Sequence, residues 1–130
     1  MDAPTATRRR SYTPLPIDAT RGFPQTFQML FGGQTYYFSL YVNVSAERLA
    51  ATDGALELPS EDAFLVVSVA RERAGGERAT IFRRKVVAGM EYEAGDIALV
   101  FTSQRVARKN LNGQGDFGSQ VAGGIAPRWA

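Results

Sequence analysis

Side chains that commonly carry chemistry are scarce in this chain of 130 residues. It has no cysteine and no histidine, and its only lysines are Lys85 and Lys109. The composition therefore excludes thiol nucleophiles, cysteine-ligated zinc and any nucleophile that an imidazole activates. Catalysis would depend on carboxylates, hydroxyls, tyrosines, arginines or one of these two lysines. We expect a protein that is not an enzyme, with no catalytic residue, no metal site, no cofactor and no small-molecule substrate.

Glu91, Glu93 and Asp96 form an acidic cluster near turns, with the carboxylates that an acid–base or cation-binding site would need. Glycosidases use two carboxylates, and hard cations prefer carboxylate oxygens. The residue spacing of a calcium loop, with Asp or Asn at alternate positions and a distal Glu, is absent. We therefore interpret these three residues as solvated charges beside a turn.

Gly113, Gly115 and Gly118 match the G-x-G-x-x-G spacing of dinucleotide-binding loops. Such a site also needs a helix that starts within the motif and lies in a βαβ unit. The residues that follow include two more glycines and a proline, which disfavour a helix. We interpret this segment as a loop and not as a nucleotide site.

Charged residues are unevenly distributed along the sequence, although the net charge is only +2. The residues near both ends are mainly basic, whereas residues 45–62 form an acidic stretch. One interpretation is a solvated surface, and another is docking of the basic ends onto an acidic neighbour in an assembly. We expect no membrane segment, because no stretch approaches the roughly 20 apolar residues of a spanning helix.

Residues 27–44 carry the clearest structural signal, which is a β-hairpin. Apolar residues alternate with others on both sides of Gly32-Gly33, which is typical of strands with one buried face. Two adjacent glycines supply the positive φ angles of a two-residue turn. This turn predicts that Phe27 lies opposite Phe38, so that both rings fall on the apolar face.

A second hairpin is predicted over residues 63–87, with its turn at Gly75-Gly76. The return strand contains Arg83–Lys85, and because neighbouring residues of a strand point in opposite directions, charge must lie on both faces. Two interpretations stay open for this strand. It is either an exposed edge that charge protects from aggregation, or an interface strand in an oligomer.

The pattern as a whole predicts an all-β fold, a small antiparallel sandwich or partly open barrel of six or seven strands with extended N- and C-terminal arms. The β domain is expected over residues 12–102, with an acidic insert at residues 45–62. Residues 1–11 are expected to form a flexible basic arm. Residues 103–130 are expected to form a Gly-rich C-terminal tail without regular structure.

Two segments together resemble a known family. The first begins with the sequence PLPI at residues 14–17 and continues through the glycine hairpin, within residues 14–44. The second contains RKVVAGMEY at residues 84–92 and a Gly-Asp turn, within residues 82–102. A proline-containing strand, a Gly-containing hairpin and a closing V-x-G strand–turn–strand are similar to the small baseplate plug proteins of contractile-tailed bacteriophages, a group typified by a cyanophage baseplate plug. The insert and the Gly-rich tail depart from that pattern.

The resemblance implies a non-enzymatic structural protein at the central hub or tube of a tail baseplate. It would be made in the host bacterial cytoplasm and carried in the virion in multiple copies, with no membrane association. Its partners would be the hub, tail-tube and spike proteins, on which the arms become ordered as apolar anchors are buried. The candidate contact residues are Arg8, Arg9, Arg10, Tyr12, Phe117, Ile125 and Trp129.

An alternative function is a small β module that binds nucleic acid or glycan. Tyr37 and Tyr41 are predicted to lie on the sheet face opposite Phe38, where aromatic rings can stack on a ligand. The basic strand around Arg83–Lys85 would supply positive charge. Salt-dependent binding to oligonucleotides would distinguish this function from assembly.

Overall fold

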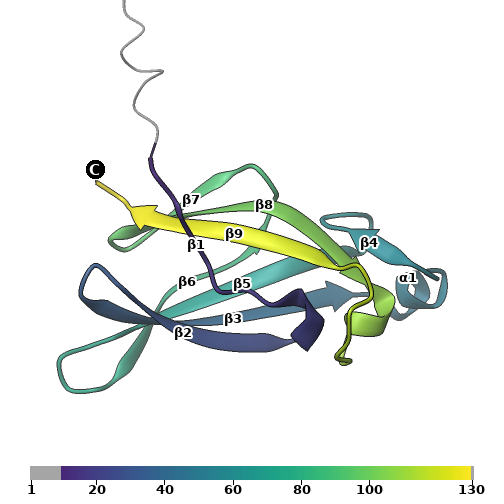
Figure 1. The fold of residues 1–130 in the computed structure, drawn as a ribbon, viewed down its shortest axis with the longest axis horizontal. Helices are drawn as coiled ribbons and strands as arrows, with labels where there is room; N and C mark the ends of the chain where they lie inside the picture. Colours follow the sequence, from purple (N-terminus) through teal and green to yellow (C-terminus); the bar gives the residue numbers. More distant parts are fainter. Residues whose placement is uncertain (1–9, 130) are drawn as a thin grey trace, which may run out of the picture.

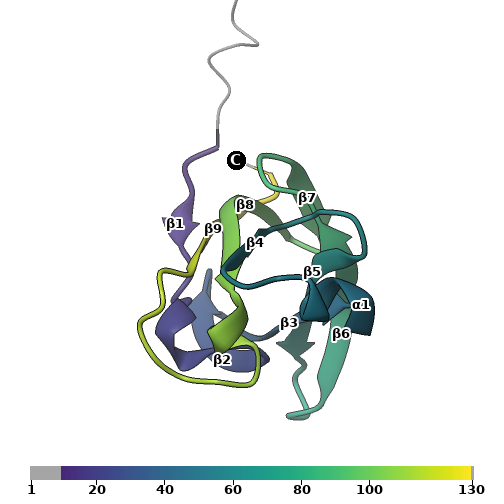
Figure 2. The same ribbon diagram turned by 90° about the vertical axis from the view of Figure 1, so that its right-hand side faces the viewer.

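The computed structural model describes residues 10–129, which form two antiparallel β-sheets packed face to face (Figure 1). The all-β prediction is confirmed, and the fold is a sandwich because the two sheets do not close into a barrel. Figure 2 views the two layers from one end. The described residues contain no helix that is long and apolar enough to cross a membrane.

One sheet has five strands, with β8 at its centre. It contains β1 (Thr13–Pro14), β4 (Ala55–Glu57), β7 (Glu91–Ala94), β8 (Ile97–Ala107) and β9 (Gln120–Pro127). The order is β1-β9-β8-β4, and β7 also pairs with β8. The five-stranded sheet therefore combines β1 and β9, from near the two ends of the chain, with β4 from its central part.

The other sheet has four strands in the order β2-β3-β5-β6. They are β2 (Gln25–Phe31), β3 (Gln34–Val44), β5 (Ala63–Glu72) and β6 (Arg78–Val86). The one α-helix of residues 10–129, α1 (Ala46–Ala50), begins after Ser45, whose hydroxyl accepts a hydrogen bond from the Arg48 backbone N–H and so caps the helix. Two short 3-10 helices, η2 (Ala19–Arg21) and η3 (Arg108–Asn110), lie in connections.

The core lies between the sheets and is built from alternating residues of the long strands. Leu40, Leu65 and Val67 of the four-stranded sheet are fully buried, as are Leu99 and Phe101 of β8. Burial of large aliphatic side chains contributes about 1.5–3 kcal/mol each, which makes this layer the main source of stability.

One buried polar residue, Gln104 on β8, ties the two sheets together. Its amide nitrogen donates hydrogen bonds to the carbonyl oxygens of Leu58, at 3.1 Å, and of Val86 on β6, at 3.2 Å. Both acceptors are thereby satisfied away from water, whereas the side-chain oxygen of Gln104 is buried without a hydrogen-bond partner among the described residues.

The register predicted for the first hairpin is confirmed. Phe27 lies opposite Phe38, with Gly32 and Gly33 in the turn at φ 58° and 80°. The two phenylalanine rings stack with their centroids 4.8 Å apart. The turn chemistry and the alternation of apolar residues therefore specify the same pairing.

The second hairpin is also confirmed, and it contains a β-bulge that the sequence pattern did not reveal. The register of β5 against β6 shifts between Val69 and Ala70, so that β6 contains one extra residue. Before the bulge Arg78 lies opposite Glu72, and after it Arg83 lies opposite Ser68. Because of the extra residue, the side chains of Arg78 and Arg83 lie on the same face of the sheet, although residues five apart point to opposite faces in a regular strand.

The C-terminal segment differs from the expected tail. Strand β8 continues to Ala107, and residues 120–127 form β9, which lies between β1 and β8. Gly123 obscures this strand in the sequence, because glycine disfavours strands and interrupts the alternation. A side chain there would lie 2.8 Å from the Phe101 ring, so the close packing requires glycine. The described part of the chain has nine strands, more than the six or seven expected.

The connection between β8 and β9 is organised around Asn110, which is fully buried. Its amide nitrogen donates hydrogen bonds to the carbonyl oxygens of Gly113, at 3.2 Å, and Gly115, at 2.9 Å. Its amide oxygen accepts a hydrogen bond of 2.6 Å from the Ser119 hydroxyl. The Gly-rich segment is thus a loop tied to one buried amide, and no helix begins within it.

Candidate interaction surfaces

Both ends of the described chain meet on β7, at one end of the five-stranded sheet (Figures 1 and 2). The Arg10 guanidinium pairs with the Glu91 carboxylate and lies 3.2 Å from Glu93, while the Tyr12 hydroxyl donates a hydrogen bond to Glu91. Glu91 and Glu93 can both face outward because alternate residues of β7 share a face of the sheet. Two acidic residues therefore hold the N-terminal segment in place.

The C-terminal segment reaches the same carboxylates. Arg128 lies 3.2 Å from Glu93, and its backbone carbonyl accepts a hydrogen bond of 2.8 Å from Arg10. The Arg128 guanidinium also lies 4.8 Å from the Trp129 ring, whose residue is 69% exposed. We name Arg10, Tyr12, Glu91, Glu93, Arg128 and Trp129 the terminal platform.

The contacts of the terminal platform shift the acidity of its members. Burial, together with the hydrogen bond to Glu91, raises the pKa of Tyr12 to about 12. The same hydrogen bond, followed by that from Arg10, lowers the pKa of the Glu91 carboxyl. At neutral pH the pair is therefore a neutral phenol that donates to a carboxylate.

The structure brings three of the seven predicted contact residues together, namely Arg10, Tyr12 and Trp129. Phe117 lies in the β8–β9 loop, where it is 43% exposed and the Lys109 ammonium stands 5.3 Å from its ring centroid. Arg8 and Arg9 lie outside the described residues.

Ile125 differs from the expectation of a partner contact. It is fully buried and packs in the core of its own chain. It lies on β9 opposite Leu99 of β8 and Thr13 of β1, so its backbone is paired on both sides within the five-stranded sheet.

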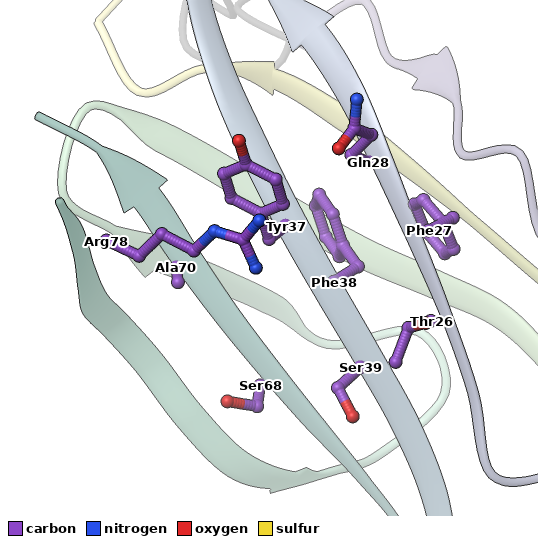
Figure 3. A pocket seen from close by; sticks show the side chains of 9 residues that line it. All are labelled: Thr26, Phe27, Gln28, Tyr37, Phe38, Ser39, Ser68, Ala70 and Arg78. Atoms are coloured by element: carbon purple, nitrogen blue, oxygen red, sulfur yellow. The ribbon is translucent and has the colours of Figure 1, made fainter. Parts of the chain in front are cut away.

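A second candidate surface is the outer face of the four-stranded sheet, which is the face turned away from the core. A shallow groove of about 470 Å³ lies on it (Figure 3). Seven residues of the groove belong to this face, and the stacked pair Phe27 and Phe38 borders it. The seven are Thr26, Gln28, Tyr37, Ser39, Ser68, Ala70 and Arg78.

Tyr37 is held firmly at one side of the groove. Its hydroxyl donates a hydrogen bond of 2.6 Å to Glu72. The Arg78 guanidinium lies 3.6 Å from its ring centroid (Figure 3). The hydrogen bond to Glu72 raises the pKa of the Tyr37 phenol. The ring is thus a fixed wall of the groove.

The charge asymmetry seen along the sequence is arranged differently in space. The basic residue Arg105 lies 3.5 Å from Glu57 in the acidic insert, and Arg108 donates to the Thr52 carbonyl oxygen in the same region. The four-stranded sheet, in contrast, contains five cationic residues and one carboxylate, Glu72. The five-stranded sheet contains three glutamates and one arginine. The asymmetry therefore lies between the two sheets.

Sequence reasoning missed the role of Glu91, Glu93 and Arg128 as partners of the N-terminal segment. Their separation of about 80 to 118 residues from Arg10 leaves no local signal. The alternation of Glu91 and Glu93 around buried Tyr92 was a usable signal, because it predicts two carboxylates on one exposed face.

Within the described residues, no group of three or more Asp or Glu side chains is arranged to hold a metal ion. Asp96, which belongs to the carboxylate group noted in the sequence, lies 3.1 Å from Arg71. A comparison of this chain with models of known families, with curated proteins and with solved structures finds no match.

Proposed function

We propose that this chain is a structural protein that acts by assembly contacts, and that it is a plug-like component of a contractile phage tail baseplate. The single observation that carries the assembly proposal is the terminal platform. It gathers both ends of the described chain and presents Trp129, which is 69% exposed, on a charged and hydrogen-bonded base. Exposed tryptophan and arginine are the residue types that contribute most at protein interfaces.

The baseplate assignment is supported by the resemblance of residues 14–44 and 82–102 to baseplate plug proteins. In the fold these segments supply β2 and β3, most of β6, and β7 with the first half of β8. The terminal platform is anchored on Glu91 and Glu93 of β7, which lie within the second of these segments, whereas Arg10, Tyr12, Arg128 and Trp129 lie outside both.

The proposal is tested by following incorporation of variants into contractile-tail particles in cells that produce them. Trp129→Ala is expected to reduce incorporation about tenfold or more. It removes an aromatic side chain of the kind that contributes about 2 kcal/mol or more of binding free energy at interfaces. Leu30→Ala is the matched control, since Leu30 is 72% exposed but lies in the β2–β3 hairpin.

Both variants should be folded, because neither side chain is buried, and circular dichroism checks this. Equal incorporation of Trp129→Ala and wild type would contradict the platform as the contact surface. Absence of the wild-type chain from the particles would contradict the baseplate assignment itself.

A further inference from the structure

The outer face of the four-stranded sheet carries an ordered set of polar, aromatic and cationic side chains that assembly through the terminal platform does not use. At its centre Thr26, Ser39 and Ser68 follow one another on β2, β3 and β5 as direct cross-strand partners. The next partner in this row is Arg83 on the edge strand β6. Four neighbouring strands thus present three hydroxyls and one guanidinium in a line about 14 Å long, from the usual strand spacing.

Aromatic rings flank the hydroxyl row on both sides, and each side has a cation. On one side is Tyr37 with the Arg78 guanidinium over its ring, as Figure 3 shows. On the other side is Tyr41, and beside it Phe64 with the Lys85 ammonium 4.9 Å from its centroid. Tyr37 and Tyr41 are four residues apart on one strand, which corresponds to about 13 Å.

The β-bulge in β6 brings the cations together. Without the extra residue, Arg78 would point to the opposite face from Arg83, because residues an odd number apart alternate in a regular strand. With the register shift, Arg78, Arg83 and Lys85 all belong to the outer face, whereas Arg84 lies over the Tyr92 ring on the other face.

This face has a net positive charge, because it holds the three cations Arg78, Arg83 and Lys85 and one carboxylate, Glu72, which lies opposite Arg78. Arg78, Arg83 and Lys85 are exposed and form no ion pair with any described residue. Glu72 is the one carboxylate in the four strands, and it accepts a hydrogen bond from the Tyr37 hydroxyl. The face therefore complements a ligand that carries several negative charges.

Protection of the β6 edge from aggregation would account for the cations but not for the rest of this face. The hydroxyl row and Tyr41 lie one to three strands away from that edge. Hydroxyls and cations that contact phosphates, together with flat rings that stack on bases, are the combination that binds single-stranded nucleic acid without sequence preference. A neutral glycan would use the rings and hydroxyls but would leave the three cations without a role.

We propose that the outer face of the four-stranded sheet binds single-stranded nucleic acid, with phosphates along Arg78, Arg83 and Lys85 and bases stacked on Tyr41 and beside Tyr37. This activity is separate from the assembly proposal and uses the opposite sheet. Either proposal can therefore fail without the other.

Fluorescence anisotropy with a labelled oligothymidylate of about 12 nucleotides tests this site, since such faces cover about 4–16 nucleotides. The full chain is expected to bind at about 50 mM salt. A plot of the logarithm of the binding constant against the logarithm of the salt concentration should have a slope of about −2 for three phosphate contacts. Arg83→Ala/Lys85→Ala should weaken binding about tenfold or more and reduce the slope by about 1.4. Arg105→Ala, which removes one positive charge from the other sheet, is the control and should bind like wild type.

Stacking is tested separately with Tyr41→Ala and Tyr41→Phe. The alanine variant should lose about tenfold in affinity, while the phenylalanine variant keeps the ring and should keep the affinity. Three outcomes of the oligothymidylate assay would overturn the proposal. They are no oligothymidylate binding by the wild-type chain, equal binding by Arg83→Ala/Lys85→Ala, and equal binding by Tyr41→Ala, which would indicate attraction of any polyanion. Binding of neutral oligosaccharides in place of oligothymidylate would also overturn it.

Discussion

At the scale of single residues, the contact between Tyr12 and Glu91 shows how the fold adjusts chemistry on its surface. The phenol donates to the carboxylate, and Arg10 reaches the same group. Burial raises the pKa of Tyr12 to about 12, and the hydrogen bond lowers the pKa of Glu91. Both shifts favour the same pair of protonation states, a neutral phenol and a charged carboxylate, across the neutral range.

Tyr12→Phe should therefore lower the free energy of unfolding by about 1 kcal/mol, the usual net value of one hydrogen bond. The raised pKa of Tyr12 means that its contribution is complete below pH 10 and is lost as pH rises through about 12. The lowered pKa of Glu91 means that its contribution is present above the ordinary value of 4.5 and is lost as pH falls. Urea unfolding of wild type and Tyr12→Phe at a series of pH values measures the difference.

The expected difference is a plateau between about pH 5 and pH 10 that falls on both sides. Tyr41→Phe is a suitable control, because the Tyr41 hydroxyl makes no hydrogen bond with any described residue. A difference that does not change with pH would contradict the assigned hydrogen bond.

At the scale of elements, the strands with strict alternation could be predicted and those interrupted by glycine could not. The β2–β3 hairpin followed from Gly32-Gly33 and the apolar pattern, down to the pairing of Phe27 with Phe38. Strand β9 did not, because Gly123 removes the alternation at the point where Phe101 packs against the backbone. The same close approach that makes glycine necessary also removes the sequence signal.

The position of β9 leads to a prediction about truncation. Removal of residues 112–130 takes away a strand that lies between β1 and β8, with Ile125 and Ala126 fully buried. We expect this truncated chain to be unfolded, as measured by circular dichroism and by the dispersion of amide signals in nuclear magnetic resonance. Removal of residues 128–130 leaves β9 intact and is the control that should stay folded. A folded protein lacking residues 112–130 would contradict the role of β9 in the core.

At the scale of the whole molecule, the sandwich separates two surfaces that differ in charge. The terminal platform stands on the five-stranded sheet with its glutamates, while Arg78, Arg83 and Lys85 occupy the outer face of the other sheet. The linear charge pattern did not predict this separation, because it depends on which strands pair and on one bulge in β6. The aromatic face was predictable in part, since Tyr37 and Tyr41 share a parity on a strand that the sequence defines well.

The central claim, that the chain is an assembled tail component, is tested most directly by the protein composition of contractile-tail particles purified from cells that encode it. Quantitative mass spectrometry is expected to find the chain in a fixed ratio to hub, tail-tube and spike proteins, and to lose it from particles when Trp129→Ala replaces the wild type. A chain that is abundant in the cell extract and absent from intact particles would contradict the account.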